Sequence, residues 1–181
     1  MALNLVDFTK EVYENAVSHG WHDTERNPAE IYVLIHSELS EALEEYRCNR
    51  GNVWYGEGGK PEGIAIELLD AVIRIFDFLG KLQVTFKTDS IEKMADTIKM
   101  NKEGDRLHDD SFPVYLCEVH DCISKAYEAG LNYQEAIGHL LGAVALIFKW
   151  LQEEDFDIEK HLIEKHEFNK NRPYRHGNKI C

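Results

Sequence analysis

The period of the apolar residues most constrains the fold of this chain. Apolar residues recur mostly at helical spacing, and no segment alternates in the manner of a half-buried strand. The pattern predicts an all-α bundle of about seven helices. A length of 181 residues suits one well-packed domain and is short for two, so we expect a single domain over residues 1–181.

Start and stop signals divide the chain into these helices. Asn27 suits an N-cap, Pro28 suits the first helical position, and Gly20 suits a position just past a helix end. The expected helices cover residues 5–18, 28–48, 62–82, 90–102, 114–129, 133–153 and 158–169, with a glycine-rich loop over 49–61, a linker over 104–113 and a basic tail over 171–181.

Two of the expected helices resemble each other. Aligning Ile66–Leu79 with Gly138–Leu151 gives identical residues at seven of fourteen positions, all of them apolar. We interpret this as a degenerate tandem duplication of a helical hairpin, with a catalytic half at about 21–104 and a degenerate repeat at about 112–170. Chance similarity between two buried apolar helices is the alternative.

The acidic residues do not survive in the second copy. Glu67 aligns with His139, and Asp70 aligns with Gly142. Apolar positions that are kept while carboxylates are lost suggest a retained core and one discarded site. One half of the molecule would therefore carry chemistry, and the other would complete the bundle.

Two pairs of carboxylates stand out in the first copy. Glu38 and Glu41 are three residues apart, as are Glu67 and Asp70, so each pair shares one face of a helix. Four carboxylates from two neighbouring helices would form a hard-oxygen site of the kind that Mg²⁺ prefers, with Mn²⁺ as an alternative. A solvated acidic face is the simpler interpretation of either pair alone.

These motifs resemble a known family. Glu38-Leu-Ser-Glu41, then 25 residues, then Glu67-Leu-Leu-Asp70 is similar to the Glu-x-x-Glu and Glu-x-x-Asp pattern of the MazG-like and related all-α nucleoside triphosphate pyrophosphohydrolases. The stretches HSELSEALEEYR (36–47) and GKPEGIAIELLDAVIRIFDF (59–78) also resemble the family, as does KHEFNKNRPYRHG (165–177). The resemblance covers residues 21–102 well and the rest more loosely.

The resemblance implies a Mg²⁺-dependent reaction. A nucleoside triphosphate, a deoxy- or non-standard nucleotide, would be cut between its α and β phosphates to a monophosphate and pyrophosphate. The four carboxylates would hold the metal, and Glu41 would position the attacking water. Lys165, Asn169 and Arg172 would contact the substrate, because they lie in the family-like segment near the C-terminus.

Other residues are candidates on chemical grounds. Lys60 can donate to a triphosphate, and Trp54 can stack on a base, as can Trp21. Packing within the core or a loop is the alternative for each tryptophan.

The net charge, the cysteine content and the hydropathy of the chain limit the kinds of partner and cellular location that we expect. The formal net charge of −13 disfavours a nucleic acid polymer, since such partners usually require a basic surface. Four cysteines without CxxC spacing fit a reducing compartment, and no apolar run approaches the roughly 18 residues of a membrane span. We expect a cytoplasmic protein, and a further homo-oligomer is left open.

Two other functions are alternatives to the hydrolase. A ferritin-like di-iron bundle would need Glu-x-x-His motifs, and the candidate metal helices contain none. The second rival is a non-catalytic helical interaction protein that retains a metal-binding cluster.

Overall fold

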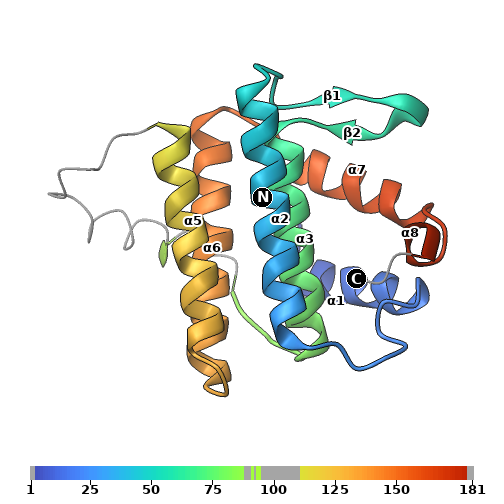
Figure 1. Cartoon of the computed structure of the whole chain (residues 1–181), viewed down its shortest axis with the longest axis vertical. Coiled ribbons are helices and arrows are strands. Elements are labelled where there is room, and N and C mark those ends of the chain that lie inside the picture. Colours follow the sequence, from blue (N-terminus) through green and yellow to red (C-terminus); the bar gives the residue numbers. More distant parts are fainter. Residues whose placement is uncertain (1–2, 88–90, 92, 95–110, 179–181) are drawn as a thin grey trace, which may run out of the picture.

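The all-α prediction is confirmed over the described residues. The computed structural model describes residues 3–87, 91, 93–94 and 111–178. Two long helix hairpins lie side by side in Figure 1, and α1 and α7 pack against α3 on the side away from the second hairpin. The first hairpin consists of α2 (Pro28–Arg47) and α3 (Ile64–Lys81), and the second consists of α5 (Phe112–Glu128) and α6 (Tyr133–Glu153). The other helices are α1 (Leu5–Ser18), α7 (Ile158–Lys170) and the short α8 (Arg175–Asn178).

Most predicted helix boundaries match those of the structure to within two residues. The Asn27 side chain accepts a hydrogen bond from the Ala29 backbone N–H, which confirms it as the N-cap of α2. Gly20 has φ +77° just past α1, a conformation that glycine adopts without strain. α5 begins at Phe112 instead of 114, because a proline fits the first turn of a helix. The expected helix over 90–102 falls largely outside the described residues.

The loop predicted over 49–61 contains a small β-hairpin. β1 (Trp54–Tyr55) pairs antiparallel with β2 (Pro61–Glu62), and a 3-10 turn (Glu57–Gly59) connects them. Strands of two residues are too short for an alternating pattern to reveal. The hairpin ends at the start of α3 and lies beside the first turn of that helix (Figure 1).

α3 is the central helix of the molecule. It packs against α1, α2, α6 and α7, which explains why it is apolar around most of its circumference. Ile75, Phe76 and Leu79 are fully buried, and each such side chain contributes about 1.5–3 kcal/mol relative to exposure. Contacts on so many sides fix the rotation of α3, and with it the direction of its polar stripe.

The two hairpins share a packing pattern. Of the seven identical apolar positions, six are buried in both copies, and the seventh, Leu69, matches the half-buried Leu141. His36 of α2 and His120 of α5 join the hairpins, with stacked rings 5.0 Å apart and their Nδ1 atoms 2.7 Å apart. Burial lowers the pKa of both imidazoles. The same apolar positions are thus buried in both hairpins, as a duplication would produce, and the duplication itself stays a prediction.

Across the described ranges, no helix is both long enough and apolar enough to cross a bilayer.

Candidate functional site

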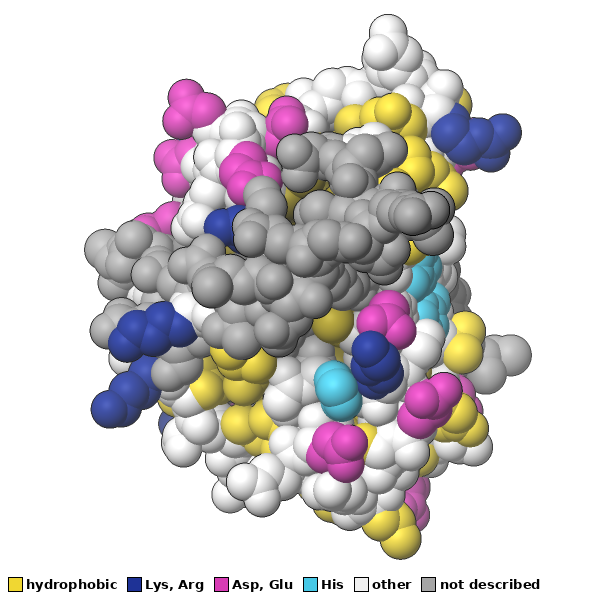
Figure 2. Space-filling model, turned by 90° about the vertical axis from the view of Figure 1, so that its left-hand side faces the viewer, with side chains coloured by type: hydrophobic (Ala, Val, Ile, Leu, Met, Phe, Trp, Pro, Cys, Tyr) yellow, Lys and Arg dark blue, Asp and Glu magenta, His cyan; other side chains and the backbone are white. Residues whose placement is uncertain are grey.

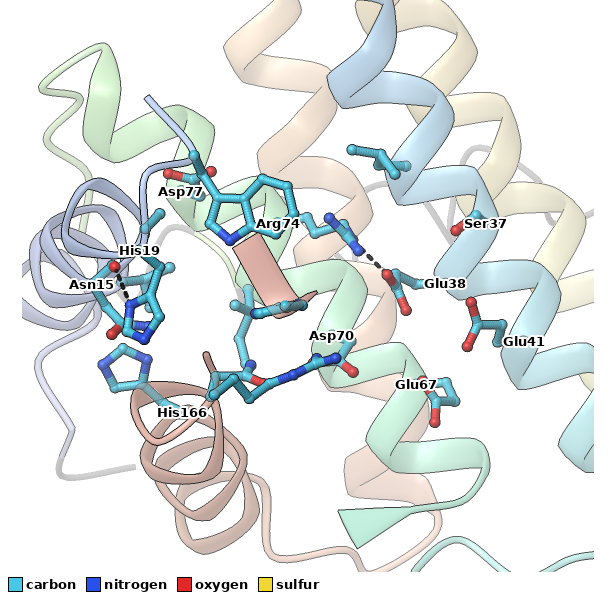
Figure 3. Close-up of a pocket in the computed structure, with 18 of the residues that line it drawn as sticks. Asn15, His19, Ser37, Glu38, Glu41, Glu67, Asp70, Arg74, Asp77 and His166 are labelled. Carbon is cyan, nitrogen blue, oxygen red and sulfur yellow. Dashed lines mark hydrogen bonds and ion pairs between the residues drawn. The ribbon is translucent and has the colours of Figure 1, made fainter. Parts of the chain in front are cut away.

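The carboxylates singled out in the sequence meet between α2 and α3. Glu38, Glu67 and Asp70 each place one oxygen within 4.8 Å of the others. Glu41 lines the same cavity without belonging to this closest group (Figure 3). The exposed fractions of Glu38 and Glu67 are only 6% and 4%. The structure therefore brings together three of the four predicted metal ligands and places the fourth beside them.

Two cations balance part of this charge. The Arg74 Nε donates to Glu38 Oε1 at 2.5 Å, and the Lys165 Nζ lies 2.9 Å from Asp70 Oδ2. Lys165 also donates to the Pro61 carbonyl oxygen at 3.0 Å, and its side chain is 1% exposed. Buried charges of this kind are stable only when paired. Lys165 thus ties α7 to α3 and to the β-hairpin at the site itself.

The burial of the site shifts the pKa values of two of its carboxyl groups. Burial raises the pKa of Glu67 to about 8, and the charge of Asp70 adds to this rise while that of Lys165 opposes it. Burial also raises the pKa of Glu38, against the opposing charge of Arg74. Because two cations do not suffice to keep Glu67 at its ordinary pKa, the site favours a further positive charge, either a proton or a metal ion.

A polar cavity of about 270 Å³ opens from the carboxylates. Its walls come from α1, α2, α3 and α7, from the β-hairpin, and from the segments that follow α1 and α7. Apart from the carboxylates and Arg74, its polar lining consists of Asn15, His19, Arg26, Ser37, Lys60, Asp77, His166, Asn169, Arg172 and His176. The cavity therefore offers a concentration of cations and amides opposite the acidic group.

Three of the predicted substrate contacts line this cavity. They are Lys60 at the hairpin, Asn169 on α7 and Arg172 just beyond it. Burial lowers the pKa of Arg172, with the charge of Asp70 opposing the shift. Lys60 lies 3.1 Å from Glu62. Lys165 is not a lining residue, because it lies behind the cavity wall and pairs with Asp70.

Trp54 lies apart from this cavity. Its indole Nε1 donates to Glu45 at 2.8 Å, and the guanidinium of Arg50 lies 5.2 Å from its ring centre. These contacts fix the hairpin to the end of α2. Trp54 packs within its loop, which was the alternative interpretation, and the tryptophan that lines the cavity is Trp21.

The part of the wall formed by α1 could not be predicted from the sequence, and His166 was not singled out within residues 165–177. Asn15 and His19 carry no motif, and only the packing of α1 on α3 brings them to the cavity. The segment after α7 closes that wall, because the Arg175 backbone N–H donates to the His19 carbonyl and its Nε donates to the Gly20 carbonyl, both at 3.0 Å. Neither contact leaves a periodic signal in the sequence.

The second hairpin has no corresponding acidic group among the described residues. His139 lies 4.0 Å from Glu135, and Gly142 is buried without a side chain to offer. Figure 2 shows the face of the molecule that carries this hairpin, where acidic, basic and histidine side chains are scattered among hydrophobic ones. A local pair such as Lys125–Asp121, 2.8 Å apart, is typical of an exposed helix surface.

No protein-family model, curated protein or solved structure matches this chain. The site must therefore be interpreted from its own chemistry. Buried carboxylate oxygens are suited to a hard divalent cation, and the arginine and lysine side chains around the cavity are suited to phosphate oxygens. Together they fit a ligand that is both anionic and able to share a metal.

Proposed function

We propose that this protein hydrolyses a nucleoside triphosphate between its α and β phosphates, with Mg²⁺ as cofactor and with Mn²⁺ as an alternative. The observation that carries the proposal is the meeting of Glu38, Glu67 and Asp70 at one end of a polar cavity lined by cations. The resemblance to the MazG-like pyrophosphohydrolases in the spacing of these residues supports it, and favours a deoxy- or non-standard nucleotide.

The residues present fit the metal. Three oxygen ligands converge from two helices. Burial, with the charge of Asp70, raises the pKa of Glu67, and a bound cation would favour the ionised form of this carboxyl group. In the proposed complex Glu38, Glu67 and Asp70 hold the ion, and Glu41 completes the set from beside them. A bound Mg²⁺ would stabilise the charge of the triphosphate and make a nearby water more acidic.

The protein's own side chains then have separate tasks. Lys60 and Arg172 bind phosphate oxygens and orient the chain of phosphates. In addition to its place in the metal set, we assign Glu41, which lies beside the three closest carboxylates, to orienting the attacking water and accepting its proton. The water oxygen bonds to the α-phosphorus, the bond to the bridging oxygen breaks, and pyrophosphate leaves with that oxygen. The products are a nucleoside monophosphate and pyrophosphate.

A product assay tests the proposal. The purified protein is incubated with a panel of ribo-, deoxy- and modified nucleoside triphosphates in Mg²⁺, in Mn²⁺ and in a chelator, and products are identified by ³¹P NMR. We expect pyrophosphate and a monophosphate from at least one nucleotide, only with metal. Release of inorganic phosphate with a diphosphate would contradict the cleavage position.

Substitutions of the carboxylates test whether the activity depends on this site. Glu38→Gln and Asp70→Asn should each lower turnover by about 100-fold or more, since even the outer-shell partners of metal ligands typically carry effects of roughly 10–100-fold. Asp121→Asn, on the exposed surface of the second hairpin, is the matched control and should retain activity. If no nucleotide is turned over, the protein is the non-catalytic interaction protein instead.

A further inference from the structure

The cavity has a second end that the metal and the phosphates do not occupy in the proposed complex. In Figure 3, Asn15, His19 and His166 gather on one side, Glu38 and Glu41 lie on the other, and Asp70 and Arg74 lie between. Asp77 of α3 is the carboxylate labelled on that side, and its Oδ1 lies 2.7 Å from the Nε2 of His22. A ligand bound at both ends must therefore have two chemically different parts.

His166 shows that this end is built for a polar ligand. Its side chain is 2% exposed and lines the cavity, yet neither ring nitrogen has a hydrogen-bond partner within the described part of the chain. Phe8 packs against the ring in a T-shaped arrangement at 5.1 Å and so fixes its position. A buried polar group without partners costs about 1–3 kcal/mol, and a ligand that pairs with it recovers this energy.

Asn169 extends the same polar surface. It lies one turn after His166 on α7 and lines the same cavity. Its Oδ1 is also buried and has no partner among the residues described. A neutral imidazole offers one donor and one acceptor, and the Asn169 oxygen offers a further acceptor. The pair can thus bind a ligand edge on which N–H donors and acceptors alternate.

An aromatic side chain lines the same cavity from the segment that follows α1. Trp21 lines the cavity, and it is held by the guanidinium of Arg26, 5.6 Å from its ring centre, and by the ring of His176 at 5.1 Å. Aromatic side chains provide sequence-tolerant stacking surfaces for planar heterocycles. Stacking and edge recognition are both available at this end of the cavity.

We infer that His166, Asn169 and Trp21 form the subsite for the base of the nucleotide, with His166 and Asn169 binding the hydrogen-bonding edge of a planar nitrogen heterocycle. This inference rests on the proposed function, which places the phosphates at the carboxylate end. It moves base recognition from the β-hairpin, where Trp54 lies, to the wall formed by α1 and α7.

A binding comparison tests the subsite separately from the phosphate end. Dissociation constants are measured in Mg²⁺ for α,β-methylene deoxynucleoside triphosphates with each of the common bases, uracil included, and for inorganic triphosphate, which has no base. We expect at least one nucleotide to bind about 10-fold more tightly than inorganic triphosphate, an increment equal to about 1.4 kcal/mol.

The variants His166→Leu and Asn169→Leu should remove this increment. Each should weaken the preferred nucleotide by about 10-fold, in line with the loss of one buried hydrogen bond, and leave inorganic triphosphate within about twofold of its wild-type value. His139→Leu on α6 is the matched control, because this histidine belongs to the second hairpin. Circular dichroism confirms that each variant folds, and Asn169→Asp replaces any leucine variant that does not.

A second measurement does not depend on the variants. The imidazole resonances of His166 should shift when the nucleoside of the preferred base is added to the wild-type protein, and should stay in place with inorganic triphosphate. Equal binding of nucleotides and inorganic triphosphate by the wild type would overturn the base subsite, as would an equal loss of both ligands in the variants. If inorganic triphosphate alone fails to bind while nucleotides still bind through His166, the proposed phosphate end is wrong and the base subsite stands.

Discussion

Lys165 of α7 lies 2.9 Å from Asp70 of α3, with its own side chain almost completely removed from water. The pair connects α7 to the Glu67–Asp70 motif of α3. Burial acts to lower the pKa of Lys165, but the charges of Asp70 and Glu67 outweigh it, so the pKa is raised and the lysine stays protonated. This ammonium group takes part in balancing the charge of the carboxylates.

Removing the lysine should therefore unbalance the site. Lys165→Met leaves Asp70 and its neighbours without a buried counter-ion, and we expect the metal-free protein to lose about 3 kcal/mol of unfolding free energy, as for other broken buried pairs. Urea denaturation measures the loss. Saturating Mg²⁺ should recover part of it, because the ion supplies the missing positive charge. Lys170→Met, which removes an exposed pair with Glu167, is the control and should change stability by less than about 1 kcal/mol.

The stability of the metal-free protein should depend on the ionisation of Glu67. Its pKa is raised to about 8 in the folded protein from an ordinary value of 4.5, so the folded state retains a proton that the unfolded state has released between these values. Stability is then complete below about pH 4.5 and falls as the pH rises towards 8, by on the order of 2–4 kcal/mol for this group alone.

Glu67→Gln should remove that contribution, because the amide does not ionise. Denaturant unfolding at intervals from pH 5 to pH 8.5, with chelator present, compares the variant with the wild type. We expect the two profiles to converge at the acid end and separate at the alkaline end, with the variant more stable. Parallel profiles across the whole range would show that Glu67 titrates normally.

Mg²⁺ should stabilise the folded protein. An ion that binds only the folded state at ten times its dissociation constant adds about 1.4 kcal/mol, which thermal unfolding detects as a rise in Tm. The double variant Glu38→Gln with Asp70→Asn should show no such rise, and Asp121→Asn should respond like the wild type. A rise of equal size in all three proteins would place the ion elsewhere.

Gly80 should control how closely α1 approaches α3. A Cβ at this position would lie 2.5 Å from the Tyr13 Cβ and 2.8 Å from the Thr9 carbonyl oxygen. Gly80→Ala should cost about 1–3 kcal/mol through this overlap and should displace the cavity wall that carries Asn15. Gly138→Ala on α6 is the matched control, because its Cβ would meet nothing within 4 Å. That substitution should stabilise the protein by about 0.5–1 kcal/mol, and equal effects at both glycines would contradict the close approach.

Within the described residues, the helices and the clustering of carboxylates between α2 and α3 could be predicted from the sequence. Helical periodicity is a local property, and capping residues such as Asn27 act within one turn, so both can be recognised along the chain. The prediction that Glu38, Glu41, Glu67 and Asp70 lie close together required only the spacing within each helix and the antiparallel packing of two consecutive helices. The small β-hairpin was not predicted, because its strands are only two residues long and show no alternating pattern.

Tertiary structure decided which side chains surround the carboxylates. Lys165 is a buried partner of Asp70 and does not line the cavity, and Trp54 donates a hydrogen bond to Glu45. Neither position could be predicted, because contacts between segments distant in the sequence fix how α7 and the β-hairpin pack. The wall with His166 exists only because α1, α7 and α3 pack together. Such contacts follow from the summed burial of whole helix faces, and this sum is not encoded at any one position of the sequence.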